Sequence, residues 1–500
     1  MPELMTTSNK QKIEGVRGST EIICRILWGM LGGYIILSAL FRWRWLSSYV
    51  SIAPLLATIL TLAIIVLIYL LRHPIGISLQ RVTVFFSAVP IRYWIVGSLV
   101  IGIALRLSVA VIAPGIDNFV SDTAAYWDLA QRLAVGDPYE NPAGRSFWPP
   151  GLPLTLAPFI AVFGPERWVF LFVNLLLYVA TSTVVFFLAK RLADGCLART
   201  VIVILAIWPN LVLLASFPNK ELLVTLLLPT AMLLYLRGVE MASHRRWRWM
   251  HFVGCGMCLG FASLTQPATM LFGFVFLGYE ALVSTPLRHR IFRLAIAGIV
   301  TILTILPWTV RNYAIHGEFI PINTAGGINF YSANNANTGG GWIPDNLYID
   351  SDFHQADEIA NNRIAFKKAF AWINENRLQF LKLIILKQTR FLCCDDTGAF
   401  ALFDNPLTPH LSNPALYQLI ALISGTFWIF LALLILYGAL SPNKFAERRF
   451  PVVFLIPLGI CYFLVIFSLF QSESKHNTLA AVFFALMASY AFQPEQNKQL

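Results

Sequence analysis

Residues 121–139 read SDTAAYWDLAQRLAVGDPY, a polar stretch inside an otherwise strongly apolar chain. Ser121 is a good helix N-cap, and Asp122 then falls in the first helical turn, where an acid favours the helix dipole. Gly136 followed by Pro138 is typical of a helix end. The stretch therefore predicts a short amphipathic helix on a surface, and it is soon followed by FWPPGLPL at 147–154.

The composition is that of a membrane protein. Of the 500 residues, 57% are hydrophobic and 13% are charged, and the mean hydropathy is +0.66. Soluble domains carry about 25% charged residues, and single apolar cores stop growing well below this length. The formal net charge of +11 resides mostly in short loops between apolar runs. We therefore interpret it as a topology signal and not as a nucleic-acid surface.

The apolar runs predict an all-α polytopic membrane protein, a bundle of about twelve transmembrane helices with amphipathic helices on the outer face. Two shorter segments, 151–164 and 378–394, are typical of re-entrant or interfacial helices. The predicted spans are 22–41, 52–71, 92–114, 167–188, 199–216, 222–237, 251–265, 268–285, 291–310, 416–438, 450–470 and 477–493.

Lysine and arginine orient these spans. Basic loops such as 243–249, 288–293 and 443–449 fall on one side, which the positive-inside rule makes cytoplasmic. The long segments 115–150 and 311–415 then face outward. The predicted organisation is a cytoplasmic tail 1–21, an N-terminal transmembrane pair 22–91, a transmembrane core 92–310 with outer loop 115–150, an outer segment 311–415, and C-terminal helices with a short tail 416–500.

Acids and bases recur at the outer ends of the spans, and together they suit a site for a membrane-borne phosphate. Cations would hold the phosphate, while carboxylates would take a proton or bind a divalent ion. Each residue alone is also consistent with an interfacial anchor. The residues are Lys220 and Glu221 in FPNKE, Arg311 in LPWTVRNY, and Glu473, Lys475 and His476 in QSESKHN.

Other polar and aromatic residues near the predicted surface helix also have a simpler structural interpretation. The helix dipole alone explains Asp122. Tyr126 is either a packing residue or a contact for the donor. Trp148 either anchors the chain at the interface or stacks on a sugar, and the first is more common. Asp117, five residues before Asp122, is a second candidate carboxylate.

Three motifs carry a family resemblance. The Asp-led helix, the PPGLPL re-entry, and PWTVRNY followed by GEFIPINTAGGINFYSANN resemble the GT-C superfamily of membrane glycosyltransferases. Within it, the chain is similar to the bacterial branch related to the aminoarabinose transferase of lipid A and to protein O-mannosyltransferases. The resemblance runs from about Ile91 to the end, and the N-terminal pair precedes it. It implies a GT-C-like bundle.

The resemblance also implies a reaction. Such enzymes take a sugar from a polyprenyl-phosphate donor on the outer face of the membrane and invert its anomeric centre, using an aspartate of the first large outer loop. Asp122 matches that aspartate, with Asp117 as the alternative. Thr123 departs from the acid that often follows it. Asp122, Asp117 and Glu473 are candidate ligands for a divalent metal ion.

The expected function is therefore a hexosyl- or pentosyltransferase of the inner (plasma) membrane, with its active site on the periplasmic or extracellular face. Its partners would be the lipid-linked donor, the bilayer and a glycan, lipid or protein acceptor, without nucleic acid. Asp122 is the expected base. The candidate phosphate and substrate contacts are Lys220, Arg311, Lys475, His476, Tyr126 and Glu221.

Two other classes remain open from sequence. A multispan transporter or lipid flippase would use the charged outer groups as a vestibule, but transporters commonly show repeated halves and ionisable residues at mid-membrane. No repeat is visible, and Arg106 is the main ionisable residue within a predicted span. A non-catalytic envelope assembly protein is disfavoured only by the polar outer residues.

Overall fold

The computed structural model describes residues 7–42, 53–112, 121–193, 195–241, 247–283, 285–341, 353, 357–404, 412–441 and 450–493. Within these residues the regular structure is helical, and the only extended pairing is an isolated bridge between Asn141 and Gly144. The predicted all-α fold class is therefore confirmed.

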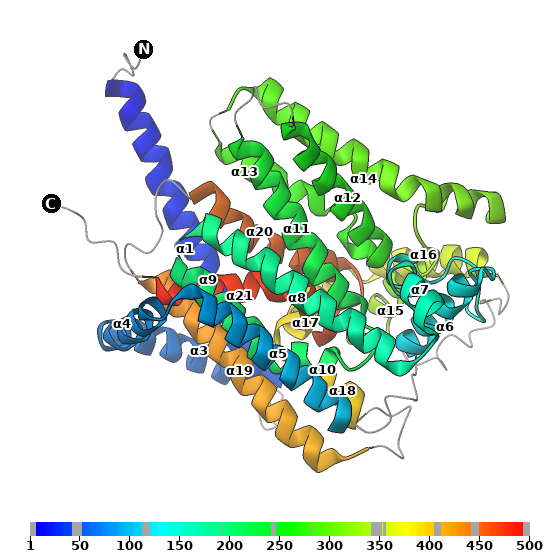
Figure 1. Cartoon of the computed structure of the whole chain (residues 1–500), viewed down its shortest axis with the longest axis horizontal. Coiled ribbons are helices and arrows are strands. Elements are labelled where there is room, and N and C mark those ends of the chain that lie inside the picture. The colour runs from blue at the N-terminus through cyan, green and yellow to red at the C-terminus, as the bar shows by residue number, and fades with distance from the viewer. Residues whose placement is uncertain are drawn as a thin grey trace.

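The long apolar helices form the body of the molecule (Figure 1). They are α1 (Thr7–Arg42), α5 (Ile91–Ile112), α8 (Arg167–Leu192), α11 (Lys220–Glu240), α14 (Leu287–His316), α19 (Pro414–Leu440) and α20 (Phe450–Leu469). Shorter helices complete the bundle. They are α3 (Ala53–Leu70), α4 (Arg72–Ala88), α6 (Ser121–Val135), α7 (Gly151–Phe163), α9 (Gly195–Ile207), α10 (Pro209–Leu214), α12 (Arg248–Thr265), α13 (Val275–Leu282), α15 (Gly326–Ala333), α16 (Glu358–Glu375), α17 (Arg377–Leu392), α18 (Thr397–Phe403) and α21 (Ala481–Ser489). In the described ranges, four 3-10 turns join them: η1 (Pro267–Thr269), η2 (Phe272–Phe274), η6 (Ser474–Ala480) and η7 (Tyr490–Phe492).

The number of spans differs from the prediction. Among the described residues, seven helices are long and apolar enough to cross a membrane, or up to eight if α3 and α4, bent by 68°, form one span. The chain is thus a multi-pass membrane protein, but the count of twelve is not confirmed. Three predicted spans, 199–216, 268–285 and 477–493, are broken into short helices and 3-10 turns. Pro209 and Pro267 begin two of the pieces, because proline cannot donate the backbone hydrogen bond that continues a helix.

The N-terminal region contains the first predicted span. Helix α1 begins at Thr7, and its apolar part, Ile22–Leu40, agrees with the predicted span 22–41. Arg72 and Arg81 both lie in helix α4. Helix α1 packs against α19, so the N-terminal helices contact the C-terminal ones.

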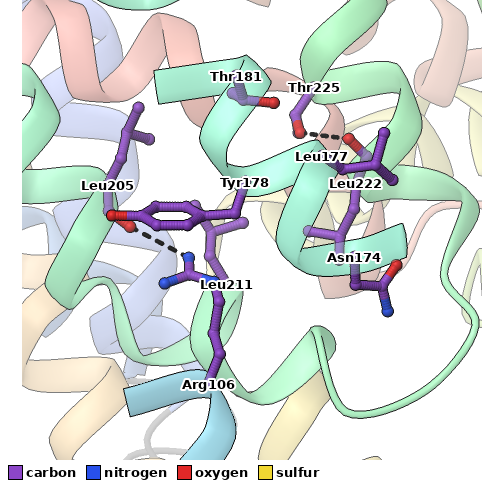
Figure 2. Close-up of a pocket in the computed structure, with 9 residues that line it drawn as sticks. All are labelled: Arg106, Asn174, Leu177, Tyr178, Thr181, Leu205, Leu211, Leu222 and Thr225. Atoms are coloured by element: carbon purple, nitrogen blue, oxygen red, sulfur yellow. Dashed lines mark hydrogen bonds between the residues drawn. The ribbon is translucent and has the colours of Figure 1, made fainter. Parts of the chain in front are cut away.

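Arg106 explains how the break between α9 and α10 is tolerated. It is 3% exposed on α5, and Nη2 and Nη1 donate to the carbonyls of Leu205 and Ala206, each at 3.3 Å. In an unbroken helix the Leu205 carbonyl would accept from residue 209, which is a proline without an N–H group. The guanidinium also lies 3.8 Å from the centre of the Tyr178 ring (Figure 2). Arg106 therefore caps a helix end and has no described contact with an outer-loop acid.

Parts of the two predicted outer segments gather at one end of the molecule. Figure 1 shows α6, α7, α15 and α16 together where α14 ends. Helix α6 begins at Ser121 and carries Asp122 in its first turn, as predicted. The helix ends at Gly136, whose φ of 82° is left-handed, and the N–H of Asp137 bonds to the Arg132 carbonyl at 2.9 Å. This is the helix end that the sequence indicated.

The FWPPG segment leads directly into α7. Consecutive prolines favour extended backbone, but Pro150 has φ −85° and ψ −10° and occupies the N-cap position of α7. Gly151 is required for close packing. A Cβ there would lie 2.2 Å from Thr265 Oγ1 and 2.6 Å from Thr265 Cα, at the end of α12.

Candidate functional site

An ion pair joins the first turn of α6 to the 3-10 turn η6. Lys475 Nζ lies 3.4 Å from Asp122 Oδ2, although 353 residues separate them in sequence. The two side chains are 31% and 36% exposed, so the pair is half-buried and remains accessible to a ligand. Asp122 attracts the ammonium strongly enough to raise the pKa of Lys475 against the effect of burial, and Glu473 adds to this. Lys475 is therefore a permanent cation at neutral pH.

A second lysine lies beside the pair. Lys220 Nζ donates to the hydroxyl of Tyr126 at 3.0 Å and lies 5.2 Å from the centre of its ring. Tyr126 is 2% exposed. Burial raises its pKa well above the usual range, and the negative charges of Asp122 and Glu221 act in the same direction. Tyr126 is thus a neutral phenol that orients Lys220, in agreement with the packing interpretation.

The start of α11 places Lys220 and Glu221. The side chain of Asn219 caps the helix by accepting from Leu222 N at 3.1 Å. Before it, Asn174 Nδ2 on α8 donates to the carbonyls of Ala215 and Phe217, each at 2.9 Å, and so holds the turn. Glu221 is 6% exposed and contributes to the field at both Tyr126 and Lys475. The caps therefore hold a cation and an acid at one helix start.

His476 has a structural partner in the same turn as Lys475. Its Nδ1 accepts from Glu473 N at 3.0 Å, and its ring stacks on Phe467 with centroids 4.2 Å apart. Burial lowers the pKa of His476 well below its usual range, and the positive charges of Lys475 and Lys220 lower it further. A neutral imidazole accepts at Nδ1 as this geometry requires, so His476 shapes the turn that presents Lys475.

Arg311 is engaged elsewhere. Near the end of α14, its guanidinium donates to the carbonyls of Tyr139 at 2.8 Å and Arg145 at 2.7 Å, and to Ser146 Oγ at 2.9 Å. It also lies 4.6 Å from the centre of the Trp308 ring. These contacts hold the loop that follows α6. A phosphate contact at Arg311 stays a prediction, and no described bond joins it to Asp122 or Lys475.

The carboxylates do not assemble a described metal site. Asp117 lies outside the described residues, so its place relative to Asp122 is not given. Across the part of the chain that the structure describes, no three His, Cys, Asp or Glu side chains are arranged to hold a metal ion. Asp122 faces a lysine instead. The ligand set of Asp122, Asp117 and Glu473 therefore stays a prediction, and we assign no step to a metal.

A third cation was missed from the sequence. Arg390, at the end of α17, lies against the turn Gly339–Gly341. A Cβ on Gly341 would be 2.9 Å from Arg390 Nη1 and 3.6 Å from Glu473 Oε1, so these two charges flank one glycine. The signal in sequence was GGG at 339–341, which allows close approach of side chains to backbone.

Two buried ionisable residues hold other elements of the bundle together. Lys387, fully buried on α17, donates to Asn334 Oδ1 at 2.7 Å and to the last carbonyls of α20. Asp395 accepts from Trp208 Nε1 and from Asn210 Nδ2, and its burial raises its pKa to about 7. Sequence gave little sign of either role, because each depends on partners far away in the chain.

Together these contacts make a compact charged site. Asp122, Glu221 and Glu473 supply carboxylates, and Lys220 and Lys475 supply ammonium groups within electrostatic range of one another. A half-buried carboxylate beside lysines can accept a proton while the cations stabilise an anion.

Residues 148–310 match the family model for dolichyl-phosphate-mannose-protein mannosyltransferases. The match covers about a third of the chain and includes Trp148, Lys220 and Glu221, but it leaves out Asp122 and Lys475. It confirms the predicted resemblance to GT-C glycosyltransferases related to the protein O-mannosyltransferases. No curated protein matches the chain in sequence.

The chain is also similar in structure to several solved proteins. The chain is similar to the oligosaccharyltransferase of Archaeoglobus fulgidus in its apo form, with a TM-score of 0.48 and 16% identity over 80% of this chain and 50% of that one. It is also similar to ArnT from Cupriavidus metallidurans bound to undecaprenyl phosphate, with a TM-score of 0.42 and 16% identity over 77% and 78% of the chains. The chain thus spans about half the length of the oligosaccharyltransferase.

Proposed function

We propose that this chain is an inverting glycosyltransferase that moves a sugar from a polyprenyl-phosphate donor to an acceptor hydroxyl. The observation that carries the proposal is the Asp122–Lys475 pair with Lys220 beside it. The family match over residues 148–310 supports the same reaction class, because the family's description names a lipid-phosphate mannose donor.

The reaction follows from the charges. Asp122 takes the proton of the acceptor hydroxyl, and that oxygen attacks the anomeric carbon of the sugar from the face opposite the phosphate. The bond from this carbon to the phosphate oxygen breaks, and its electron pair leaves with the polyprenyl phosphate. Lys475 and Lys220 stabilise the departing anion as point charges. One displacement inverts the anomeric centre.

The site belongs, in this proposal, on the periplasmic or extracellular face of the inner (plasma) membrane. Basic residues concentrate at the opposite ends of the helices, for example Lys190 and Arg191 at the end of α8. The positive-inside rule makes those ends cytoplasmic. The acceptor is a hydroxyl of a glycan, a lipid or a protein, reached from the side where α6, α7, α15 and α16 gather.

Breaking the sugar–phosphate bond distinguishes this function from a flippase. Purified protein in liposomes is given polyprenyl-phosphate-linked sugars labelled in the sugar, together with extracted envelope acceptors. A transferase releases polyprenyl phosphate and puts the label on the acceptor. Label that crosses the bilayer with its lipid bond intact in every donor tested would overturn the proposal and favour transport.

A further inference from the structure

Glu358 is a buried acid outside the proposed active site. It lies in the first turn of α16, in the predicted outer segment 311–415, and its side chain is 9% exposed. Its carboxylate accepts from Arg145 N at 2.9 Å, from Ser146 N at 3.2 Å and from Thr324 Oγ1 at 2.6 Å. The donors come from the loop after α6 and from the link after α14. One carboxylate therefore ties two outer segments together.

The loop is shaped to receive this carboxylate. Gly144 has a φ of 139°, which favours glycine, and a Cβ there would lie 2.5 Å from Glu358 Oε2. His316 Nε2 lies 3.4 Å from Glu358 Oε1 and 2.9 Å from Ser146 Oγ, so the end of α14 closes the same pocket. Successive backbone N–H groups that converge on a carboxylate form an anion-binding nest.

The same loop leads directly to the site. Tyr139 donates its hydroxyl to the carbonyls of Trp148 and Pro149, each at 3.2 Å, and so closes the loop on itself. Trp148 packs edge to face on Tyr126 with ring centroids 5.4 Å apart. Tyr126 receives the hydrogen bond of Lys220. A continuous set of contacts thus runs from the nest to the lysine beside Asp122.

We infer that Glu358 is a positioning residue: by filling the nest at Arg145 and Ser146, it holds the loop that sets Trp148, Tyr126 and Lys220 for transfer. The role of Glu358 in transfer rests on the proposed function, whereas the nest rests on the contacts alone. Loss of the carboxylate leaves two backbone N–H groups and a hydroxyl without their acceptor, and the loop then loosens.

Asp357 offers a matched control. It is the neighbouring acid at the same helix start, and its Oδ1 caps α16 by accepting from Ile359 N at 3.0 Å and Ala360 N at 2.9 Å. It makes no described bond to the loop. Asp357→Ala should therefore weaken the first turn of α16 without emptying the nest.

The test measures hydrogen exchange and transfer on the full-length protein. In Glu358→Ala, exchange in a peptide covering 140–148 should speed up by about tenfold or more, which is the effect of losing one buried hydrogen bond. In Asp357→Ala, exchange should rise only at 358–361. Glu358→Gln keeps one acceptor oxygen and should be intermediate, which guards against a variant that merely fails to fold. Gly144→Ala should loosen the same peptide with Glu358 intact.

For transfer, Glu358→Ala should lower kcat by about tenfold or more with a smaller change in KM, while Asp357→Ala stays within about twofold. Unchanged exchange at 140–148 in Glu358→Ala would overturn the nest. Faster exchange with unchanged kcat would overturn the positioning role. A wild-type protein without any transfer would instead sink the proposed function, and the exchange result would still decide the nest.

Discussion

Removing the positive charge of Lys475 should separate its role in the site from any role in stability. Lys475 and Asp122 are 31% and 36% exposed, and their charged atoms are 3.4 Å apart. For a pair this accessible, the ion pair contributes about 0–1 kcal/mol to folding. A charged hydrogen bond to a phosphate contributes roughly 1.5–3 kcal/mol, or about ten- to a hundredfold in rate. Lys475→Gln should therefore lower kcat/KM by that factor and leave the melting temperature nearly unchanged.

The assay compares Lys475→Gln, Lys475→Arg and wild type with one lipid-linked donor, alongside thermal unfolding in detergent. Arginine keeps the charge and should retain most of the transfer. The raised pKa means that the charge of Lys475, and the stability that it contributes, is present throughout neutral pH and is lost only as pH rises past the usual lysine range. A large drop in the melting temperature of Lys475→Gln together with normal transfer per folded molecule would instead assign Lys475 a role in stability alone.

Three further predictions concern other parts of the fold. His476 has a lowered pKa and accepts a hydrogen bond at Nδ1, so the folded protein holds its neutral form and stability should fall as pH drops below about 6.5. His476→Gln should reduce the change of melting temperature with pH between about pH 5 and 8, and an unchanged pH dependence would contradict this prediction. Gly151→Ala should lower the free energy of unfolding by about 1–3 kcal/mol, because the added Cβ overpacks against α12. Gly298→Ala has open space around its Cβ and should be neutral or stabilising. Equal melting temperatures of the two variants would contradict the close packing at Gly151. Cysteines placed at the exposed positions Ala143 and Ala336 should react with an impermeant reagent in intact cells, and protection of both would reverse the proposed orientation.

Local signals in the sequence were sufficient for local structure. The helix over 121–135 and the left-handed glycine that follows it were predicted correctly, because the signal for a helix end lies in adjacent residues. The residues around FWPPG were predicted less well. Pro150 is compatible with both extended and helical backbone, and packing of Gly151 against Thr265 decides between them.

The count of twelve spans stays a prediction, because hydropathy alone does not fix where a helix ends. Hydropathy registers apolar residues but not whether a helix continues through Pro209, where Arg106 must supply hydrogen bonds from another helix. The predicted site residues Asp122, Lys220, Glu221 and Lys475 do come together, yet their pairing could not be derived from sequence. It depends on contacts between segments separated by hundreds of residues. The sequence does not single out Glu358, because only the tertiary fold places it in the nest.

Asp122 is the proposed base of the transfer, and a comparison with a second acid on the same helix tests this role. Asp128 lies on the same helix α6, is 50% exposed and pairs with Arg132 at 3.2 Å, so Asp128→Asn is the matched control for Asp122→Asn. Transfer from a polyprenyl-phosphate donor is measured for both in liposomes, beside Asp117→Asn. We expect a loss of about a hundred- to ten-thousandfold for Asp122→Asn at an almost unchanged melting temperature, and near-normal rates for Asp128→Asn. Normal transfer in Asp122→Asn would contradict this expectation, and loss in Asp117→Asn alone would assign the base to that residue.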